Sequence, residues 1–189
     1  MDSGGSEVGE VKKLRKTVLF IAMSLDGYIA DRGGSVAWLS GQENDDEDID
    51  TYSEFVKGID TILMGWNTYH QVVTELSPKV WVYGNFTTYV LTHKECGSTQ
   101  QIRFTSENPA ALLKRLKAEA GKDIWICGGA TLIQQLMDKD LIDEYDISVI
   151  PILLGSGIRL FGNMEKEIKL RLCKTRAYNG ITELVYVRR

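Results

Sequence analysis

The sequence predicts an α/β fold, a three-layer sandwich built around a mostly parallel central sheet. Stretches typical of strands alternate with stretches typical of helices over most of the chain, an order that favours parallel strand pairing. Several of the strand stretches are continuous apolar runs, as expected for central strands covered on both faces. Near the C-terminus, Asn179-Gly180 lies between residues 168–175 and 182–187 and is a strong signal for a hairpin turn. We therefore expect the sheet to end in an antiparallel hairpin.

The other elements follow in chain order. The strands are predicted over residues 17–23, 61–64, 89–92, 101–104, 124–127 and 145–150. The helices are predicted between them, over residues 45–57, 67–76, 109–121 and 131–141. The third helix has the clearest start, because Asn108 suits the N-cap and Pro109 suits the first helical position.

Length and composition indicate one soluble domain. The 189 residues suffice for a substantial core, and we expect a single domain over residues 16–189. Residues 1–15 are expected to form a disordered tail, since the first ten are rich in glycine, serine and acids. A formal net charge of −4 argues against a general nucleic-acid binder. The sequence shows neither a bilayer-spanning apolar run nor a signal peptide, so we expect a cytoplasmic protein with no membrane partner.

The cysteines and histidines offer little for metal chemistry. Cys96, Cys127 and Cys173 are scattered singly, which is typical of reduced thiols in a cytosolic protein. His70 and His93 are the two histidines of the chain. A zinc site or a Ser-His-Asp triad is therefore not expected, and we predict no metal.

The most informative stretch is residues 124–132. A short apolar run is followed at once by Gly128-Gly129, and the next residues open a helix. A strand that turns through glycines into a helix presents free N–H groups at the positive end of the helix dipole, where a phosphate can approach the main chain. Residues 61–69 form a second junction of this kind around Gly65. Each junction alone is also explained as plain turn chemistry, but two of them suggest a ligand with more than one phosphate.

Three further segments follow strands and could carry chemistry. Asp26-Gly27 leaves the first strand at the edge where α/β sheets bind ligands, and a tight turn is an equal alternative. Residues 92–94, Thr-His-Lys, suit an anionic group such as a ribose 2′-phosphate, although a solvated turn explains them as well. The Gly-Ser-Gly at 155–157 is favoured as a sharp connection over a further phosphate site.

An acidic cluster over residues 43–50 lies at a predicted helix start. Carboxylates in a first helical turn are favoured by the dipole by about 0.3–1 kcal/mol each, which accounts for the cluster without a function. A helix that faces a cleft could instead turn one acid inward as a proton donor. Asp50 is the candidate for that catalytic role, and also for binding the substrate.

The order of the motifs carries a resemblance. The relevant segments are 24–30 (Ser-Leu-Asp-Gly-Tyr-Ile-Ala), 63–69 (Leu-Met-Gly-Trp-Asn-Thr-Tyr), 90–94 (Val-Leu-Thr-His-Lys), 127–132 (Cys-Gly-Gly-Ala-Thr-Leu) and 151–161 (Pro-Ile-Leu-Leu-Gly-Ser-Gly-Ile-Arg-Leu-Phe). With these five in order, the chain resembles the dihydrofolate reductase-like superfamily. It looks closest to the branch with the C-terminal reductase domain of riboflavin-biosynthesis proteins and its small stand-alone relatives.

The resemblance implies that NADPH lies across the carboxyl edge of the sheet. One helix N-terminus would bind its pyrophosphate through Gly65, Asn67 and Thr68, with Trp66 beside them. The other helix N-terminus would bind the cofactor through Gly128, Gly129, Ala130, Thr131 and Leu132. The adenosine 2′-phosphate would lie near Thr92, His93 and Lys94.

The same resemblance implies where the nicotinamide and the substrate lie. Ala22, Ile29 and the loop 33–38 would enclose them. The residues expected on the substrate side are Asp26, Val36, Trp38 and Asp50. Relatives of this branch are often dimers, so a homodimer through the C-terminal hairpin is expected.

One departure affects the cofactor. The family usually has Arg after the Met-Gly of the second motif, whereas this chain has Trp66. An indole can stack on adenine but cannot neutralise a 2′-phosphate, so the preference for NADPH depends on Lys94 and NADH stays an alternative.

The sequence thus predicts an NAD(P)H-dependent oxidoreductase that reduces a C=N or C=O bond of a heterocycle. The resemblance to 5-amino-6-(5-phosphoribosylamino)uracil reductase implies the class of this substrate. Two alternatives stay open: dihydrofolate reduction, and a dinucleotide- or pterin-binding protein without turnover.

Overall fold

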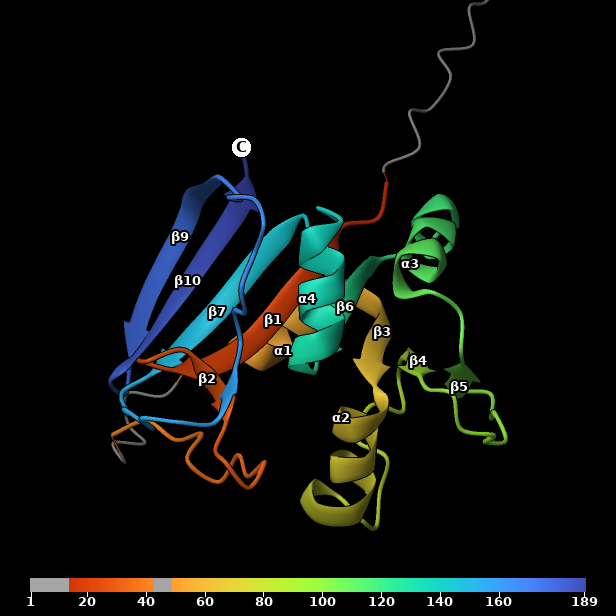
Figure 1. Ribbon diagram of the computed structural model, residues 1–189, viewed down its shortest axis with the longest axis horizontal. Coiled ribbons are helices and arrows are strands. Elements are labelled where there is room, and N and C mark those ends of the chain that lie inside the picture. Colours follow the sequence, from red (N-terminus) through yellow and green to blue (C-terminus); the bar gives the residue numbers. More distant parts are fainter. Residues whose placement is uncertain (1–13, 43–48) are drawn as a thin grey trace, which may run out of the picture.

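A computed structural model describes residues 14–42 and 49–189. Its main sheet has eight strands in the order β5-β4-β3-β6-β1-β7-β10-β9 (Figure 1). Pairing is parallel from β5 through to β7 and antiparallel where β10 joins β7 and β9. The strands are β1 (Thr17–Ser24), β3 (Ile59–Gly65), β4 (Thr87–Leu91), β5 (Ile102–Thr105), β6 (Asp123–Gly128), β7 (Glu144–Ile150), β9 (Leu170–Tyr178) and β10 (Ile181–Arg188). The predicted parallel sheet with a C-terminal hairpin is confirmed.

Helices cover both faces of this sheet. The helices are α1 (Thr51–Val56), α2 (Trp66–Gln71), the π-helix η2 (Val72–Leu76), α3 (Pro109–Ala118) and α4 (Ala130–Asp138). Figure 1 shows α4 in front of the sheet and α1 behind it. Among the described residues, no helix has both the length and the apolar character that crossing a bilayer requires.

Alternation along the strands builds two cores, one on each face. On β1, Leu19 belongs to the core beneath α3 and α4, whereas its neighbour Phe20 packs with the core on the opposite face. Phe20 stacks on Phe55 of α1 with ring centroids 4.1 Å apart, and Trp125 of β6 meets Phe55 edge-on at 5.4 Å. Such aromatic pairs contribute about 0.5–1.5 kcal/mol each beyond their burial. The continuous apolar runs of the central strands therefore reflect two covered faces.

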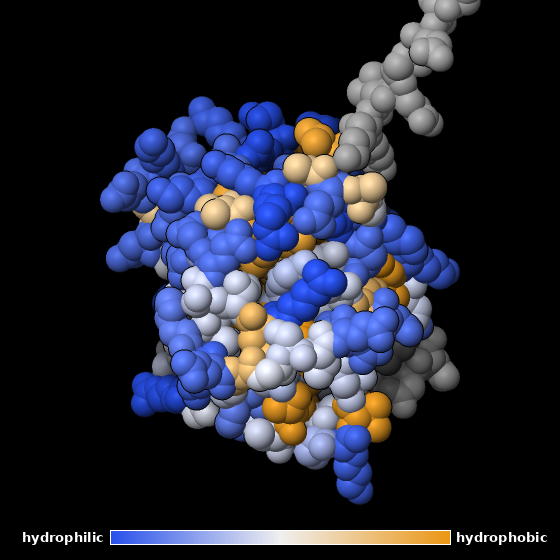
Figure 2. Space-filling model, turned by 90° about the vertical axis from the view of Figure 1, so that its right-hand side faces the viewer, coloured by the Kyte–Doolittle hydropathy of each residue, from blue (hydrophilic) through white to orange (hydrophobic). Residues whose placement is uncertain are grey.

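The hydropathy of the surface agrees with this layering. Figure 2 shows the side of the molecule that carries α3 and the β4–β5 edge, and its surface is mostly hydrophilic with small hydrophobic groups between. The apolar residues of the sheet thus lie beneath the helices on this side.

Several helix boundaries differ from the prediction. The helix expected over 45–57 is described from Thr51, and the acidic residues 43–48 lie outside the described residues. The helix expected over 67–76 forms as α2 followed by η2. The helix expected to reach residue 141 ends at Asp138, because Asp140 has a φ of +54° and the N–H of Leu141 turns back to the carbonyl of Leu136 at 3.0 Å.

Two short strands were not predicted. β2 (Tyr28–Ala30) and β8 (Ile158–Arg159) pair as a separate two-stranded sheet. Three and two residues are too few to show a strand period in the sequence. This small sheet joins the motif after β1 to the motif after β7.

The N-terminal boundary also differs. Residues 1–13 of the expected tail lie outside the described residues, and Arg15 is buried. Its guanidinium donates to Oγ1 of Thr61 at 2.7 Å and pairs with Asp60, both on β3. Arg15 therefore fixes the start of β1 against β3.

The C-terminal hairpin turns at the predicted residues. Asn179 and Gly180 have φ values of +45° and +75°, as a two-residue hairpin turn of this hand requires. The turn also contacts a distant loop, because the N–H of Gln42 donates to the Asn179 carbonyl at 2.9 Å and to its side-chain oxygen at 2.8 Å. Gly41 lies so close to Asn179 that a Cβ at this position would overlap the Asn179 carbonyl oxygen. Residues 41–42 are thus held by the tip of the hairpin.

Candidate functional site

A cleft of about 810 Å³ opens at the carboxyl ends of β1, β3 and β6. One wall is formed by β2 and the loop after it, and the other by α2 and η2. This is the edge at which parallel α/β sheets bind ligands. Among the residues expected to bind cofactor or substrate, those that line the cleft are Ala22, Ile29, Val36, Gly65, Trp66, Asn67, Thr68, Gly128, Gly129, Ala130, Thr131 and Leu132.

The two glycine junctions face each other across this cleft. Gly65 is the N-cap of α2 and Gly129 is the N-cap of α4, and no side chain caps either helix. A Cβ on Gly65 would lie 3.9 Å from the main-chain nitrogen of Gly129. The first N–H groups of two helices therefore converge on one space, as a pyrophosphate with two phosphate groups would need.

The Gly-Gly junction leaves room for a ligand at the main chain. Gly128 has a φ of +122°, and the peptide bond between the two glycines is cis. A Cβ on Gly129 would lie 3.3 Å from Oγ1 of Thr68, a side chain of the opposite junction. Side chains at these positions would fill the space between the junctions, so the residues present fit a dinucleotide pyrophosphate.

Trp66 of the cleft is contacted by Lys94. Trp66 lines the cavity, and the ammonium of Lys94 lies 4.1 Å from the centroid of its ring. The N–H of Lys94 donates to Oγ1 of Thr92 at 3.0 Å, which fixes the segment. Thr92, His93 and Lys94 do not line the cavity themselves. Lys94 therefore reaches the cleft through its contact with the indole.

The opposite wall is a loop held by its own polar groups. The carboxylate of Asp31 accepts the N–H groups of Gly33 at 2.7 Å and Ser35 at 2.9 Å. Nε2 of Gln71, on α2, donates to the carbonyl of Gly34 at 2.7 Å and so bridges the two walls. Nε1 of Trp38 donates to the Ser35 carbonyl at 3.1 Å, and Trp38 lies outside the cavity lining.

Asp26 lies outside the cleft and joins two loops. Its carboxylate accepts the hydroxyl of Ser24 at 2.6 Å and the N–H groups of Leu154 at 3.1 Å and Gly155 at 2.7 Å. The Ser24 hydrogen bond, with the two backbone donors, lowers the pKa of Asp26. Asp26, which was expected on the substrate side, thus links the turn after β1 to the Gly-Ser-Gly loop. This contact agrees with the interpretation of that loop as a sharp connection.

Asp50 also lies outside the cavity lining. It is exposed and forms the N-cap of α1, accepting the N–H of Ser53 at 2.9 Å. Hydrogen bonding by Ser53 lowers its pKa, so its carboxylate is ionised at neutral pH. The structure thus gives Asp50 a capping role at the start of α1, and its role as a proton donor stays a prediction.

The cleft also contains residues that the sequence reasoning missed. Tyr83 and Cys127 line its floor, and His70, Gln71 and Glu75 line the wall formed by α2 and η2. Cys127 directly precedes the Gly-Gly motif, which could have drawn attention to it. Tyr83 lies between elements and carries no comparable signal in the sequence.

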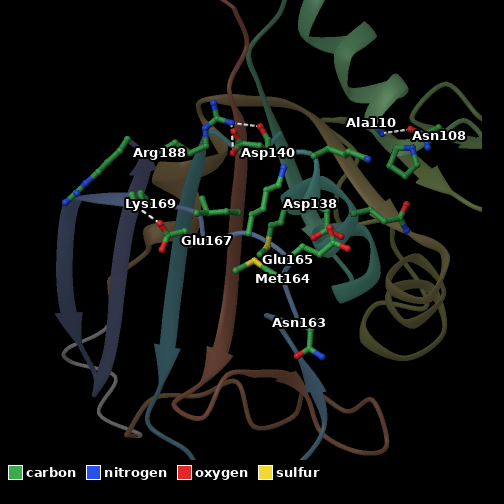
Figure 3. A pocket seen from close by; sticks show the side chains of 17 residues that line it. Asn108, Ala110, Asp138, Asp140, Asn163, Met164, Glu165, Glu167, Lys169 and Arg188 are labelled. Carbon is green, nitrogen blue, oxygen red and sulfur yellow. Dashed lines mark hydrogen bonds and ion pairs between the residues drawn. The ribbon is translucent and has the colours of Figure 1, made fainter.

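A second hollow, of about 1110 Å³, lies beside α3 and α4 (Figure 3). Ion pairs on its border join Arg188 to Asp140 at 2.8 Å and Lys169 to Glu167 at 3.2 Å. The N-terminus of α3 reaches it, but the side chain of Asn108 already accepts the N–H groups of Ala110 and Ala111. The helix N-terminus that reaches this hollow is therefore already capped by a side chain of the protein.

The chain is similar in sequence to two proteins of Bacillus subtilis. It is 44% identical to the uncharacterized protein YwjB of Bacillus subtilis over 175 residues, which is 92% of this chain and 98% of YwjB. It is 31% identical to the uncharacterized protein YyaP of the same organism, over 92% of this chain and 95% of YyaP.

Solved structures share the fold. A Shewanella sp. PV-4 protein assigned to riboflavin biosynthesis superposes with a TM-score of 0.79 at 31% identity, over 92% of this chain and 99% of that one. The deaminase/5-amino-6-(5-phosphoribosylamino)uracil reductase of Thermotoga maritima gives 0.68 at 16% identity, over 94% of this chain and 58% of that one. A dihydrofolate reductase of Enterococcus faecalis, solved with NADP(H), gives 0.64 at 15% identity, over 92% and 96%.

The dihydrofolate reductase-like fold expected from the motif order is confirmed by these structures. A family model described as the RibD C-terminal domain matches residues 15–182, which includes every element that forms the cleft. The chain therefore belongs to the RibD C-terminal domain family.

Proposed function

We propose that this protein is an NADPH-dependent reductase of a heterocyclic substrate. The observation that carries the proposal is the pair of uncapped helix N-termini, at Gly65 and Gly129, that face each other across one cleft. Membership of the RibD C-terminal domain family supports a reductase, and the cleft supplies a fitting place for a dinucleotide.

Different residues of the cleft would bind different parts of the cofactor. The main chain at Gly65–Thr68 and at Gly128–Thr131 would bind the pyrophosphate. Ala22 and Ile29, with Val36 of the loop, would enclose the nicotinamide and exclude water from it. When bound, the cofactor supplies the hydride, while the protein supplies orientation and a dry surface.

The adenosine end would be read by Trp66 and Lys94 together. An indole offers a stacking surface for adenine, and the ammonium above it offers a charge for a 2′-phosphate. This pair supports NADPH as the cofactor despite the Trp at a position where the family usually has Arg. If Lys94 contacts only the indole of Trp66 and not a 2′-phosphate, NADH is the alternative cofactor.

The proposed substrate is an aminouracil, as in the reaction named for the Thermotoga maritima relative. Reduction of dihydrofolate is a second candidate, supported by the fold shared with the Enterococcus faecalis enzyme. Reduction of either would need a C=N or C=O bond placed against the nicotinamide, beside Ala22.

A spectrophotometric assay tests the proposal. NADPH or NADH is mixed with the protein and either 5-amino-6-(5-phosphoribosylamino)uracil or dihydrofolate, and oxidation of the cofactor is followed. We expect NADPH oxidation that depends on both protein and heterocycle. Cofactor binding, seen as quenching of the tryptophan fluorescence, without oxidation by either heterocycle would instead support a binding protein without turnover. Failure of both cofactors to bind at micromolar concentration would overturn the proposal.

We also propose that the protein is a cytoplasmic homodimer. Its β9 edge has five consecutive exposed residues, 171–175, and the Leu172 side chain is half exposed. An unpaired edge of this kind is a template for pairing with a second chain. Sedimentation of the wild type and of Leu172→Lys tests this: a dimer that the substitution dissociates is expected, and a wild-type monomer would contradict it.

A further inference from the structure

Two protic side chains that line the cleft, Tyr83 and Cys127, have no role in the dinucleotide binding proposed above. Cys127 lies on β6 immediately before the Gly-Gly junction. Tyr83 lies on the segment between η2 and β4. The thiol of Cys127 donates to Oη of Tyr83 at 4.0 Å, so the two groups form a pair.

The Tyr83 ring is fixed by aromatic neighbours. It meets Trp81 edge-on at 5.2 Å and Trp125 edge-on at 5.5 Å. Trp125 is itself held, because its Nε1 donates to the Phe20 carbonyl on β1 at 3.0 Å. The Tyr83 ring is therefore packed between Trp81 of its own segment and Trp125 of the sheet.

Tyr83 lies over the same face of the sheet as Ala22, one of the residues proposed to enclose the nicotinamide. Phe20 and Ala22 are two residues apart on β1 and so lie on one face of the sheet. Tyr83 packs over the same face through Trp125.

The Tyr83 hydroxyl has hydrogen-bonding capacity to spare. Its oxygen accepts the thiol hydrogen, and within residues 14–42 and 49–189 no acceptor contacts its own hydrogen. Burial raises the pKa of Tyr83, and burial raises the pKa of Cys127 to about 12, so both groups are neutral at physiological pH. A neutral phenol that lines a cavity with a free hydrogen is suited to donate to a ligand.

We propose that Tyr83 is a substrate-binding residue that donates a hydrogen bond to a carbonyl oxygen or ring nitrogen of the heterocycle, with Cys127 positioning its hydroxyl. Aminouracils and pterins carry such acceptors along one edge. The hydrogen bond would orient that edge and so place the reducible bond against the nicotinamide. This inference rests on the proposed function, because it requires a heterocycle bound in the same cleft.

The test is Tyr83→Phe, which removes the hydroxyl and keeps the ring between Trp81 and Trp125. Tyr69→Phe is the matched control, since Tyr69 lies on α2 outside the cavity lining and packs edge-on against Phe104 at 5.1 Å. Calorimetry measures binding of NADPH, and then binding of 5-amino-6-(5-phosphoribosylamino)uracil and of dihydrofolate to the NADPH-loaded protein. Steady-state oxidation of NADPH gives kcat and KM for each heterocycle.

We expect Tyr83→Phe to bind NADPH as the wild type does and to bind the heterocycle about ten- to a hundredfold more weakly. The control should match the wild type in both measurements. Heterocycle affinity and kcat/KM within twofold of the wild type in Tyr83→Phe would overturn the role of Tyr83 and leave the proposed function standing. A wild-type protein that binds NADPH but neither heterocycle, or that fails to bind NADPH, would overturn both.

Discussion

The cleft at the carboxyl edge of the sheet and the hollow beside α3 and α4 differ in how their polar groups are satisfied. The hollow is larger, about 1110 Å³ against about 810 Å³. In the hollow, a side chain caps the helix that reaches it, and ion pairs join Arg188 to Asp140 and Lys169 to Glu167. In the cleft, two helices begin at glycines without side-chain caps. Unsatisfied donors that converge on one space indicate a ligand site better than volume does.

Gly129→Val should have the largest effect on the cleft. The added side chain would approach Thr68 Oγ1 and occupy the space between the two helix N-termini. We expect NADPH affinity to fall at least about tenfold, or about 1.4 kcal/mol. Gly97→Val is the control, because a Cβ at Gly97 meets nothing within 4 Å. Fluorescence titration measures both, and a folded Gly129→Val protein with unchanged affinity would remove the junction from the cofactor site.

Asp146 lies on β7, away from both the cleft and the hollow, and should affect stability without affecting binding. Burial, followed by the charge of Glu183, raises its pKa to about 7. Since the folded state holds this proton more tightly than the unfolded state, stability should fall as pH rises from about 4 to about 7, by at most about 1.4 kcal/mol per pH unit. Above about 7 this contribution should be constant.

Asp146→Asn tests that pH dependence, because an amide keeps the shape of the protonated acid and does not ionise. Urea unfolding across this range should show that the substituted protein loses less stability on raising the pH than the wild type does. The same slope in both proteins would mean that Asp146 is not the group responsible. NADPH affinity should be equal in the two.

Asn108→Ala tests the hollow directly. It removes the cap of α3, whose side chain accepts two backbone N–H groups. We expect the free energy of unfolding to fall by about 1 kcal/mol, measured in urea, with NADPH affinity unchanged. A loss of NADPH affinity would contradict the difference drawn between the cleft and the hollow, since it would show that the hollow takes part in binding.

Lys94→Ala should give the smallest effect. The ammonium is exposed, and exposed charges contribute about 0–1 kcal/mol. We expect the preference for NADPH over NADH, measured as a ratio of dissociation constants, to fall about threefold. Equal weakening of both cofactors would show that Lys94 supports the indole and does not read the 2′-phosphate.

The predictable parts of this fold are those with a strong local cause. Asn179-Gly180 specified the hairpin because few residue pairs adopt two positive φ values, and Asn108-Pro109 specified the start of α3 because Asn caps a helix N-terminus and Pro fits the first helical position. The Gly-Gly junction was located from the sequence because strand, glycines and helix follow one another without interruption. The roles of these cleft residues in binding stay predictions.

The remaining parts depend on contacts between distant segments. Asp50 and Asp26 have the chemistry of functional acids, but whether a carboxylate faces a cleft or caps a helix is decided by packing that sequence patterns do not express. Tyr83 reaches the cleft from a connection without regular structure and is held there by Trp125 of β6, a strand far from it along the chain. Such positions cannot be assigned from local patterns.

The contact between residues 41–42 and the tip of the hairpin has a consequence for synthesis on the ribosome. The loop that forms one wall of the cleft is translated before the hairpin, and Asn179, which holds its far end, follows Gln42 by 137 positions. A nascent chain can therefore form most of its parallel sheet before that wall has its anchor. The binding surface would be complete only after the hairpin has been translated.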